Sequence, residues 1–395
     1  MAAKFDKYKK DIDRSSFVRY SDNYLNSLFG SNKVAPLWVA DSDFIVMPQL
    51  VKAMKKVAKR GLYPYELKTP AIKQPLIDWF AKRHNIKLKM DALQFTTSVL
   101  TGLAAAIDEL TEKGDGILIQ PPVYNAFKGL IEGVDRTIVN NPLSLKDGKY
   151  EIDFKDLEKK AADKKTKAMI LCSPHNPVGR VWAKKELEKV ADICIANNVL
   201  MLTDEIHCDI IYSHVKFTGM TEVYKGKSDH IIMFGSAGKS FGIPGLVDSF
   251  IYTPNEEYKN TLQSRIMRFH LGKSNSFGIV AMKTVYKHGF KWLDKKISYL
   301  EATVSMIDEF LKKNLPDVKL IKPEGTYQVW LDFNKVVKND EELGELLFKK
   351  AKVGIAPGKM YGPGGNGFAR MNIASPQPMI MDALKSIGHA VNLSK

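Results

Sequence analysis

A single lysine, Lys239, lies in a stretch of small residues that follows an apolar segment. The stretch reads Met233-Phe-Gly-Ser-Ala-Gly-Lys-Ser-Phe-Gly-Ile-Pro-Gly-Leu246. Lysine is a strongly hydrated cation, so its position among Gly, Ser and Ala at the end of an expected strand requires a reason. One reason is chemical, because a lysine amine can form a Schiff base with a carbonyl cofactor. On this stretch alone, a lysine in an ordinary surface loop is the alternative.

Three more polar stretches follow expected strands, and their residues have ordinary interpretations when taken singly. Asn176 could serve a turn between prolines, Asp204 could cap a helix, and His207 could be a satisfied core histidine. Ligands of an open parallel sheet bind beyond the carboxyl ends of its strands. The shared position at strand ends therefore favours one binding site. The four stretches are residues 98–102, 173–179, 204–207 and 236–240.

These stretches supply what pyridoxal 5′-phosphate (PLP) requires beside a Schiff-base lysine. The Asp204 carboxylate would keep the pyridine nitrogen protonated, because a neighbouring negative charge raises the pKa of that nitrogen. The turn at 98–102 begins a helix, whose N–H groups and dipole favour a phosphate, and Ser236 adds a hydroxyl. Tyr124 could lie flat on the ring, although a core aromatic explains it equally well. Arg370 would bind a substrate carboxylate through two hydrogen bonds.

Strands and helices alternate through the middle of the chain, which predicts a mostly parallel sheet with helices on both faces. The C-terminal third changes to long helices and separate strands, typical of a smaller α+β unit. We expect a large domain at 48–285 and a small domain formed by 1–47 and 286–395. The expected strands are 94–98, 116–120, 167–172, 199–203, 230–234, 249–252, 326–333 and 368–373. The expected helices are 51–60, 71–84, 101–110, 184–198, 257–269, 292–313, 341–352 and 379–391.

Composition narrows the class of protein. The 395 residues are 45% hydrophobic and 26% charged, as in a soluble globular protein. The sequence contains neither an apolar run long enough to span a bilayer nor an N-terminal secretion signal. Three separated cysteines without a CxxC pair argue against a disulfide framework or a zinc site. We therefore expect a cytoplasmic protein with no metal and no membrane partner.

The formal net charge of +15 raises the possibility of a nucleic-acid partner. The basic residues are spread along the chain and are often interleaved with acidic ones. No helix-turn-helix, RNA-binding signature or zinc finger accompanies them. We expect no nucleic-acid binding.

The order of the motifs resembles that of fold-type-I PLP-dependent enzymes. More narrowly, the chain is similar to the MalY/PatB-type cystathionine β-lyases (C–S lyases) of the class I/II aminotransferase superfamily. Trp38-Val-Ala-Asp-Ser-Asp-Phe44 also matches, and the resemblance extends from about residue 5 to the C-terminus. The other matching motifs are Pro121-Pro-Val-Tyr124, Ser173-Pro-His-Asn-Pro-Val-Gly179, Asp204-Glu-Ile-His207, the Lys239 stretch, Thr326-Tyr327 with Trp330, and Phe368-Ala-Arg-Met-Asn372.

The resemblance implies the type I PLP-dependent transferase fold, a large domain with a mostly parallel seven-stranded sheet flanked by helices plus a smaller α+β domain. It implies that Lys239 forms the Schiff base and accepts the Cα proton. Asp204 would hold the pyridinium, Asn176 would bond the phenolic oxygen of PLP, and Tyr124 would stack on the ring. The other implied cofactor-binding residues are Ser98, Val99, Leu100, Ile206, His207, Ser236 and Tyr63.

The resemblance also implies the partners. Arg370, with Asn176 and Tyr124, would bind a small amino-acid substrate. Tyr63 would reach the PLP phosphate in the active site of a neighbouring subunit. The implied catalytic residues are Lys239, Asp204, Tyr124 and Tyr63. The implied assembly is a homodimer with active sites shared across the interface.

Two positions favour a lyase over an aminotransferase. His207 stands where many aminotransferases have a tyrosine, and Val247 stands where many have a phosphate-binding arginine. We expect α,β-elimination of L-cystathionine or related S-substituted cysteines to a thiol (homocysteine), pyruvate and ammonia. An aminotransferase acting on an L-amino acid is the alternative, and a PLP-binding regulator is a further one. The chain departs from the lyase pattern at Ser42, Ser98 and Gly238, which bears on substrate choice.

Overall fold

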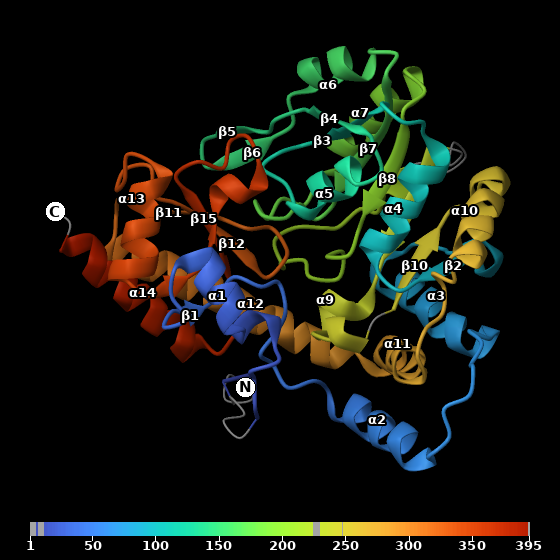
Figure 1. Cartoon of the computed structure of the whole chain (residues 1–395), viewed down its shortest axis with the longest axis horizontal. Helices are drawn as coiled ribbons and strands as arrows, with labels where there is room; N and C mark the ends of the chain where they lie inside the picture. Colours follow the sequence, from blue (N-terminus) through green and yellow to red (C-terminus); the bar gives the residue numbers. More distant parts are fainter. Residues whose placement is uncertain (1–4, 7–11, 224–229, 247, 394–395) are drawn as a thin grey trace.

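The computed structural model describes residues 5–6, 12–223, 230–246 and 248–393, and a seven-stranded sheet forms its centre (Figure 1). The strand order is β2-β10-β9-β8-β7-β3-β4. β10 runs antiparallel to both neighbours, whereas the other neighbouring strands are parallel. The expected mostly parallel sheet is confirmed. Its strands are β2 (Leu93–Thr96), β3 (Gly116–Ile119), β4 (Thr137–Asn140), β7 (Thr166–Cys172), β8 (Leu200–Asp204), β9 (Ile231–Gly235) and β10 (Ser249–Tyr252).

The central strands are apolar runs because helices cover both faces of the sheet. Every residue of β8 and β9 is buried, as expected for parallel strands without a solvent face. On one face, α4 (Val99–Leu110), α5 (Ala126–Glu132) and α10 (Glu256–Arg268) pack against the strands. On the other, α6 (Phe154–Ala161), α7 (Lys184–Ala196) and α8 (Met220–Val223) do so. This packing leaves the ends of the strands as the places where polar groups can gather.

A second, antiparallel sheet lies in the C-terminal third. Its strand order is β11 (Lys319–Ile321), β12 (Gln328–Asp332), β15 (Phe368–Asn372) and β14 (Ala356–Pro357). The long helix α12 (Phe290–Asn314) and the C-terminal helix α14 (Gln377–Asn392) accompany it. In Figure 1 the orange and red strands of this sheet lie to the left of the central sheet, whose strands are coloured from blue-green to yellow.

The N-terminal segment is tied to this C-terminal unit. β1 (Ala35–Pro36) pairs in parallel with β13 (Val353–Gly354), and the blue helix α1 (Asp22–Phe29) lies beside the C-terminal elements in Figure 1. This arrangement is consistent with a small domain built from both ends of the chain. The boundaries at 48 and 285 stay predictions, and residue 285 lies inside α11 (Ser276–His288).

Several elements differ from the sequence-based expectation. β4 and α11 were not anticipated, nor was the hairpin of β5 (Ser144–Lys146) and β6 (Lys149–Glu151). The single helix expected at 341–352 is α13 (Asp340–Gly344) followed by a π-helical segment, Glu345–Lys350. The Ala351 N–H donates to the Leu346 carbonyl at 2.9 Å, which is the wider hydrogen-bond spacing of a π-helix.

Other helices end where their sequence predicts. α2 (Pro48–Arg60) has proline in its first turn and stops at Gly61, whose φ of 66° is left-handed. α3 spans Pro70–His84 and ends at Asn85, which has the same left-handed conformation. Such residues terminate helices by satisfying the last carbonyls. Among the described residues, no helix is long and apolar enough to cross a membrane.

Candidate active site

A cavity of about 260 Å³ opens at the carboxyl edge of the central sheet. Its lining is drawn from the segments that follow β2, β3, β7, β8 and β9, and from α11. The structure thus brings the four polar stretches together at the edge where open parallel sheets bind ligands. The expected site residues in the lining are Ser98, Val99, Leu100, Tyr124, Asn176, Asp204, Ile206, His207, Ser236 and Lys239.

Lys239 lies on α9 (Ala237–Phe241), the short helix after β9, and its side chain is half-buried. Its Nζ donates a hydrogen bond of 2.7 Å to the Ala40 carbonyl. Burial and the positive charge of Arg370 lower the pKa of Lys239 to about 8, while Asp41 and Asp204 oppose the shift. A lowered pKa gives a larger neutral fraction near neutral pH, and the neutral amine is the form that attacks a carbonyl.

Asp204 is the last residue of β8 and is buried. Its Oδ1 accepts a 3.1 Å hydrogen bond from the Ile206 N–H, the one bond that its carboxylate receives from the part of the chain that the structure describes. Burial raises the pKa of Asp204 to about 6, partly offset by the Ile206 N–H and by Lys239. A buried carboxylate with so few donors fits a cationic N–H partner, because burying an unpaired charge is costly.

The N-terminus of α4 forms another part of the lining. Ser98 caps the helix, since its Oγ accepts a 3.0 Å hydrogen bond from the Thr101 N–H. The amides of Val99 and Leu100 belong to the first turn, where no partner inside the helix exists. These N–H groups and the helix dipole suit a phosphate.

The Ser236 hydroxyl is already engaged. It donates to the Asp248 carbonyl at 2.7 Å and accepts from the Gly238 N–H at 3.1 Å, so its proton is not directed at a ligand. Asp248 also lines the cavity, with Lys68 Nζ 3.2 Å from its carboxylate. Phosphate binding by Ser236 stays a prediction. Val247, where an arginine is common, lies outside the described residues.

Arg370 lies on β15 and contacts Asn176, which lines the cavity, but Arg370 itself does not line it. It is buried, and its Nη1 donates to the Asn176 Oδ1 at 3.2 Å, while Nη2 donates to the Trp38 carbonyl. Its Nε has no hydrogen-bond partner among the described residues. The clamp on a substrate carboxylate that the sequence predicts is therefore adjacent to the cavity but partly occupied by protein groups.

His207 and Tyr124 contribute uncharged groups. His207 is buried and lines the cavity, but its Nδ1 finds no partner in the described part of the chain, unlike a fully satisfied core histidine. Burial, with the positive charges of Lys239, Arg370 and Lys296, holds the pKa of His207 well below its usual value. Burial also raises the pKa of the Tyr124 hydroxyl. Both side chains are neutral at pH 7.

Tyr63 does not reach the cavity of its own chain. It is 58% exposed, its hydroxyl donates to the Ala58 carbonyl at 3.1 Å, and its ring stacks on Phe277 at 6.1 Å. Its expected role in a neighbouring subunit's site stays a prediction.

The cavity contains residues that the sequence analysis did not assign. Ala40 belongs to the matched segment 38–44, which received no role, and Cys172 ends β7. Gly278, Ala281 and Met282 come from the unanticipated α11. Asn275, which caps that helix by accepting from the Gly278 N–H at 2.8 Å, is the start signal that could have revealed it.

One group of possible metal ligands lies outside the cavity. His84, Cys208 and Asp209 have ligand atoms within 4.8 Å of one another. The Asp209 carboxylate, however, already accepts hydrogen bonds from Trp79 and Ser240, each at 2.8 Å, and lies 2.7 Å from His84 Nε2. We assign this group to packing, and the absence of a metal stays a prediction.

Known proteins share this architecture and much of the sequence. The family model for aminotransferase class I and II matches residues 35–387. The chain is 36% identical to cystathionine beta-lyase PatB of Bacillus subtilis, with 98% of this chain and 100% of that protein covered. It is 28% identical to protein MalY of Escherichia coli, with 97% and 98% covered. The structure of cystalysin from Treponema denticola, which contains PLP, has a TM-score of 0.93, 32% identity and coverage of 98% and 99%. The PLP-bound C–S lyase from Staphylococcus hominis has a TM-score of 0.90, 30% identity and coverage of 98% and 97%.

Proposed function

The chain belongs to the aminotransferase class I and II family, and we propose that within it the protein is a PLP-dependent carbon–sulfur lyase. The substrate is L-cystathionine or a related S-substituted cysteine, which is converted to a thiol, pyruvate and ammonia. The observation that supports this proposal most strongly is that the Lys239 amine and the buried Asp204 carboxylate line the same cavity. A relative that matches the chain over its full length is a cystathionine beta-lyase.

The residues of the cavity fit PLP. Lys239 offers an amine with a lowered pKa, and Asp204 offers a buried carboxylate for the pyridinium. The first-turn amides of α4 at Val99 and Leu100 would hold the phosphate, and Tyr124 would cover one face of the ring. When bound, PLP supplies a ring that withdraws electrons from the substrate Cα.

Lys239 performs the proton transfer in this proposal. When it is not bonded to PLP, its amine would accept the Cα proton of the substrate. Burial favours the neutral amine that this step needs, because the charged form is poorly solvated in the cavity. The negative charge of Asp204 would hold the pyridinium of PLP and stabilise its positive charge. The thiolate then departs from Cβ, and hydrolysis of the remaining three-carbon fragment gives pyruvate and ammonia.

Arg370 and Asn176 orient the substrate. Arg370 is the buried cation beside the cavity, and its guanidinium can exchange the Asn176 contact for two hydrogen bonds to the substrate α-carboxylate. This would fix the Cα–H bond relative to Lys239. Fixing the reacting atoms supplies a large part of the rate in such reactions.

The direct test is an assay of the purified PLP-loaded protein with L-cystathionine and no added keto acid. Thiol and pyruvate should appear in equal amounts and continue to form over many turnovers. L-Methionine is the matched control, because its sulfur is attached at Cγ and elimination at Cβ is impossible. Absence of thiol while PLP is bound would contradict the lyase proposal. Turnover that requires a keto acid would favour the aminotransferase.

We further propose that the protein works as a homodimer in the cytoplasm. Large apolar side chains near Tyr63 are exposed, with Leu62 at 69% and Leu67 at 81%, which is typical of a surface that another subunit covers. All three cysteines are buried and free, as suits a reducing compartment. A sedimentation mass equal to the 44.4 kDa chain mass would contradict the dimer, and recovery in a membrane or secreted fraction would contradict the location.

A further inference from the structure

The Ala40 carbonyl accepts hydrogen bonds from two side chains of the candidate site. It accepts from the Lys239 Nζ at 2.7 Å and from the Tyr327 hydroxyl at 2.9 Å. Ala40 also lines the cavity. The position of one backbone oxygen on the N-terminal segment therefore determines where the lysine amine is held.

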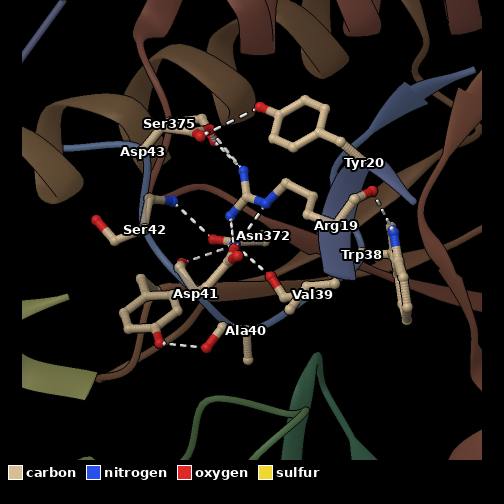
Figure 2. Close-up of polar contacts among 12 residues, drawn as sticks. Arg19, Tyr20, Trp38, Val39, Ala40, Asp41, Ser42, Asp43, Asn372 and Ser375 are labelled. Carbon is tan, nitrogen blue, oxygen red and sulfur yellow. Dashed lines mark hydrogen bonds and ion pairs between the residues drawn. The ribbon is translucent and has the colours of Figure 1, made fainter. Parts of the chain in front are cut away.

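A buried arginine fixes the segment that carries this carbonyl (Figure 2). Arg19 is 0% exposed. Its Nε donates to the Asp41 Oδ1 at 2.6 Å, and its Nη1 donates to the carboxylate of Asp43 and, at 3.0 Å, to the Ser375 Oγ. Figure 2 shows the guanidinium between Asp41 and Asp43. Because Asp41 follows Ala40 directly, a fixed Asp41 restricts the Ala40 carbonyl.

Asn372 secures the same segment from the other side. Its Nδ2 donates to the carbonyls of Val39 and Asp41, the latter at 3.0 Å. The carbonyls of the residues before and after Ala40 are thus both held by β15. This leaves the Ala40 carbonyl little freedom to turn away from Lys239.

The buried charges call for an explanation beyond stability. Arg19 and Asp43 are almost fully removed from water, whereas the Asp41 side chain stays 30% exposed. Burying such charges is costly, and these clusters contribute little net stability compared with apolar packing. Directional, charge-assisted hydrogen bonds do, however, define the geometry of the groups that they join. Arg19 holds two aspartates on either side of Ser42 in one arrangement, and apolar contacts would not impose that arrangement on the backbone.

We propose that Arg19 is a positioning residue: through Asp41 and Asp43 it holds the Ala40 carbonyl, which binds the Lys239 amine whenever that amine is free of the cofactor. The proposal rests on the proposed function, in which the free amine accepts the Cα proton. A neutral amine has two N–H groups and one lone pair. Donation of one N–H to Ala40 restricts rotation about the Cε–Nζ bond, so the lone pair is presented to the cavity in a defined direction.

The test compares Arg19→Met and Arg19→Lys with Arg136→Met. Arg136 is a matched control because it is also buried, at 6% exposure, and hydrogen-bonds to Asp108 and Thr111 far from the cavity. With L-cystathionine, Arg19→Met should lower kcat by about tenfold or more, as expected for a misplaced reacting group, with little change in KM. The isotope effect of α-deuterated substrate on kcat should rise, because proton transfer becomes slower than the other steps. Arg136→Met should leave the kinetic constants and the isotope effect unchanged.

A second readout does not depend on turnover. In the cofactor-free proteins, the rate at which Lys239 reacts with an acylating reagent should differ about tenfold between Arg19→Met and the wild type, since the hydrogen bond that holds the amine is weakened and the charge of Asp41 is no longer compensated. Peptide mass spectrometry measures that rate, and Arg136→Met should match the wild type. If Arg19→Met does not fold, the same labelling rate is measured in Arg19→Lys. That variant should also differ from the wild type, because one ammonium cannot bridge both aspartates.

The outcomes separate this proposal from the proposed function. Unchanged Lys239 labelling together with an unchanged isotope effect in the Arg19 variants would overturn the positioning role. Wild-type protein that releases no thiol would defeat the lyase proposal, but the labelling experiment would still report whether Arg19 controls the Lys239 amine. A loss of folding stability alone, equal in Arg19→Met and Arg136→Met, would mean that Arg19 serves packing only.

Discussion

Replacement of Lys239 by alanine is expected to lower pyruvate formation from L-cystathionine by at least about 10⁴-fold, the upper range for loss of a general base. The variant loses both the amine that would form the Schiff base and the group that would accept the Cα proton. The fall should be in kcat, because Asn176 and Arg370 remain in place to bind the substrate. Steady-state assays of thiol and pyruvate at saturating PLP measure it.

Lys160→Ala is the control for this prediction. Lys160 is also half-buried and is paired with Asp156 at 2.7 Å on α6, away from the cavity. It should keep wild-type kinetics. A Lys239→Ala protein that retains a tenth or more of the wild-type rate would show that another residue carries the chemistry.

Asp204→Asn is expected to lower kcat by about 10²- to 10³-fold, similar to removal of another preorganised electrostatic contact in an active site. The substitution preserves shape but removes the negative charge that would keep the pyridine nitrogen protonated. PLP should still bind through Lys239, with lower affinity. Titration of the cofactor-free variant with PLP, followed by rate measurements at saturation, separates the two effects.

Glu205→Gln is a matched control beside Asp204. Glu205 is also buried, and burial raises its pKa to about 8, so the carboxyl is mostly protonated at pH 7. Glutamine resembles that neutral acid, and the variant should retain most of the wild-type rate. If Glu205→Gln were as damaging as Asp204→Asn, loss of local packing rather than loss of the Asp204 charge would explain both.

The central sheet could be predicted from the sequence, and so could the edge of the sheet at which the site lies. The reason is physical. Strands buried on both faces must be apolar throughout, so polar residues such as Asp204 can stand only where the strand ends. Alternation with helices makes those strands parallel and places their carboxyl ends together. Lys239, Asp204 and Asn176 could therefore be grouped without coordinates.

The support around the site could not be predicted in this way. Arg19 and Ser375 form a hydrogen bond across 356 positions of sequence, and no local pattern marks such a pair. The role of Ala40 rests on its backbone carbonyl, which every residue has. α11 was not predicted, although Asn275 caps it and precedes an apolar run, which is the usual start signal of a helix.

The sequence motifs predicted where site residues lie better than they predicted the hydrogen bonds that those residues make. Ser236 and Arg370 are near the cavity, as the resemblance implied, but both have protein partners in the structure. A sequence pattern names a residue but does not show where its protons point. Their roles toward phosphate and substrate carboxylate remain predictions for mutagenesis.

Reduction of the purified PLP-loaded protein with borohydride, followed by peptide mass spectrometry, shows whether Lys239 is the residue that forms the Schiff base. Borohydride makes the bond between a lysine and PLP permanent, so the modified residue can be identified. We expect one reduced cofactor per chain, attached to Lys239, together with loss of thiol release from L-cystathionine. A cofactor attached to any other lysine, or full activity after Lys239 has been modified, would contradict it.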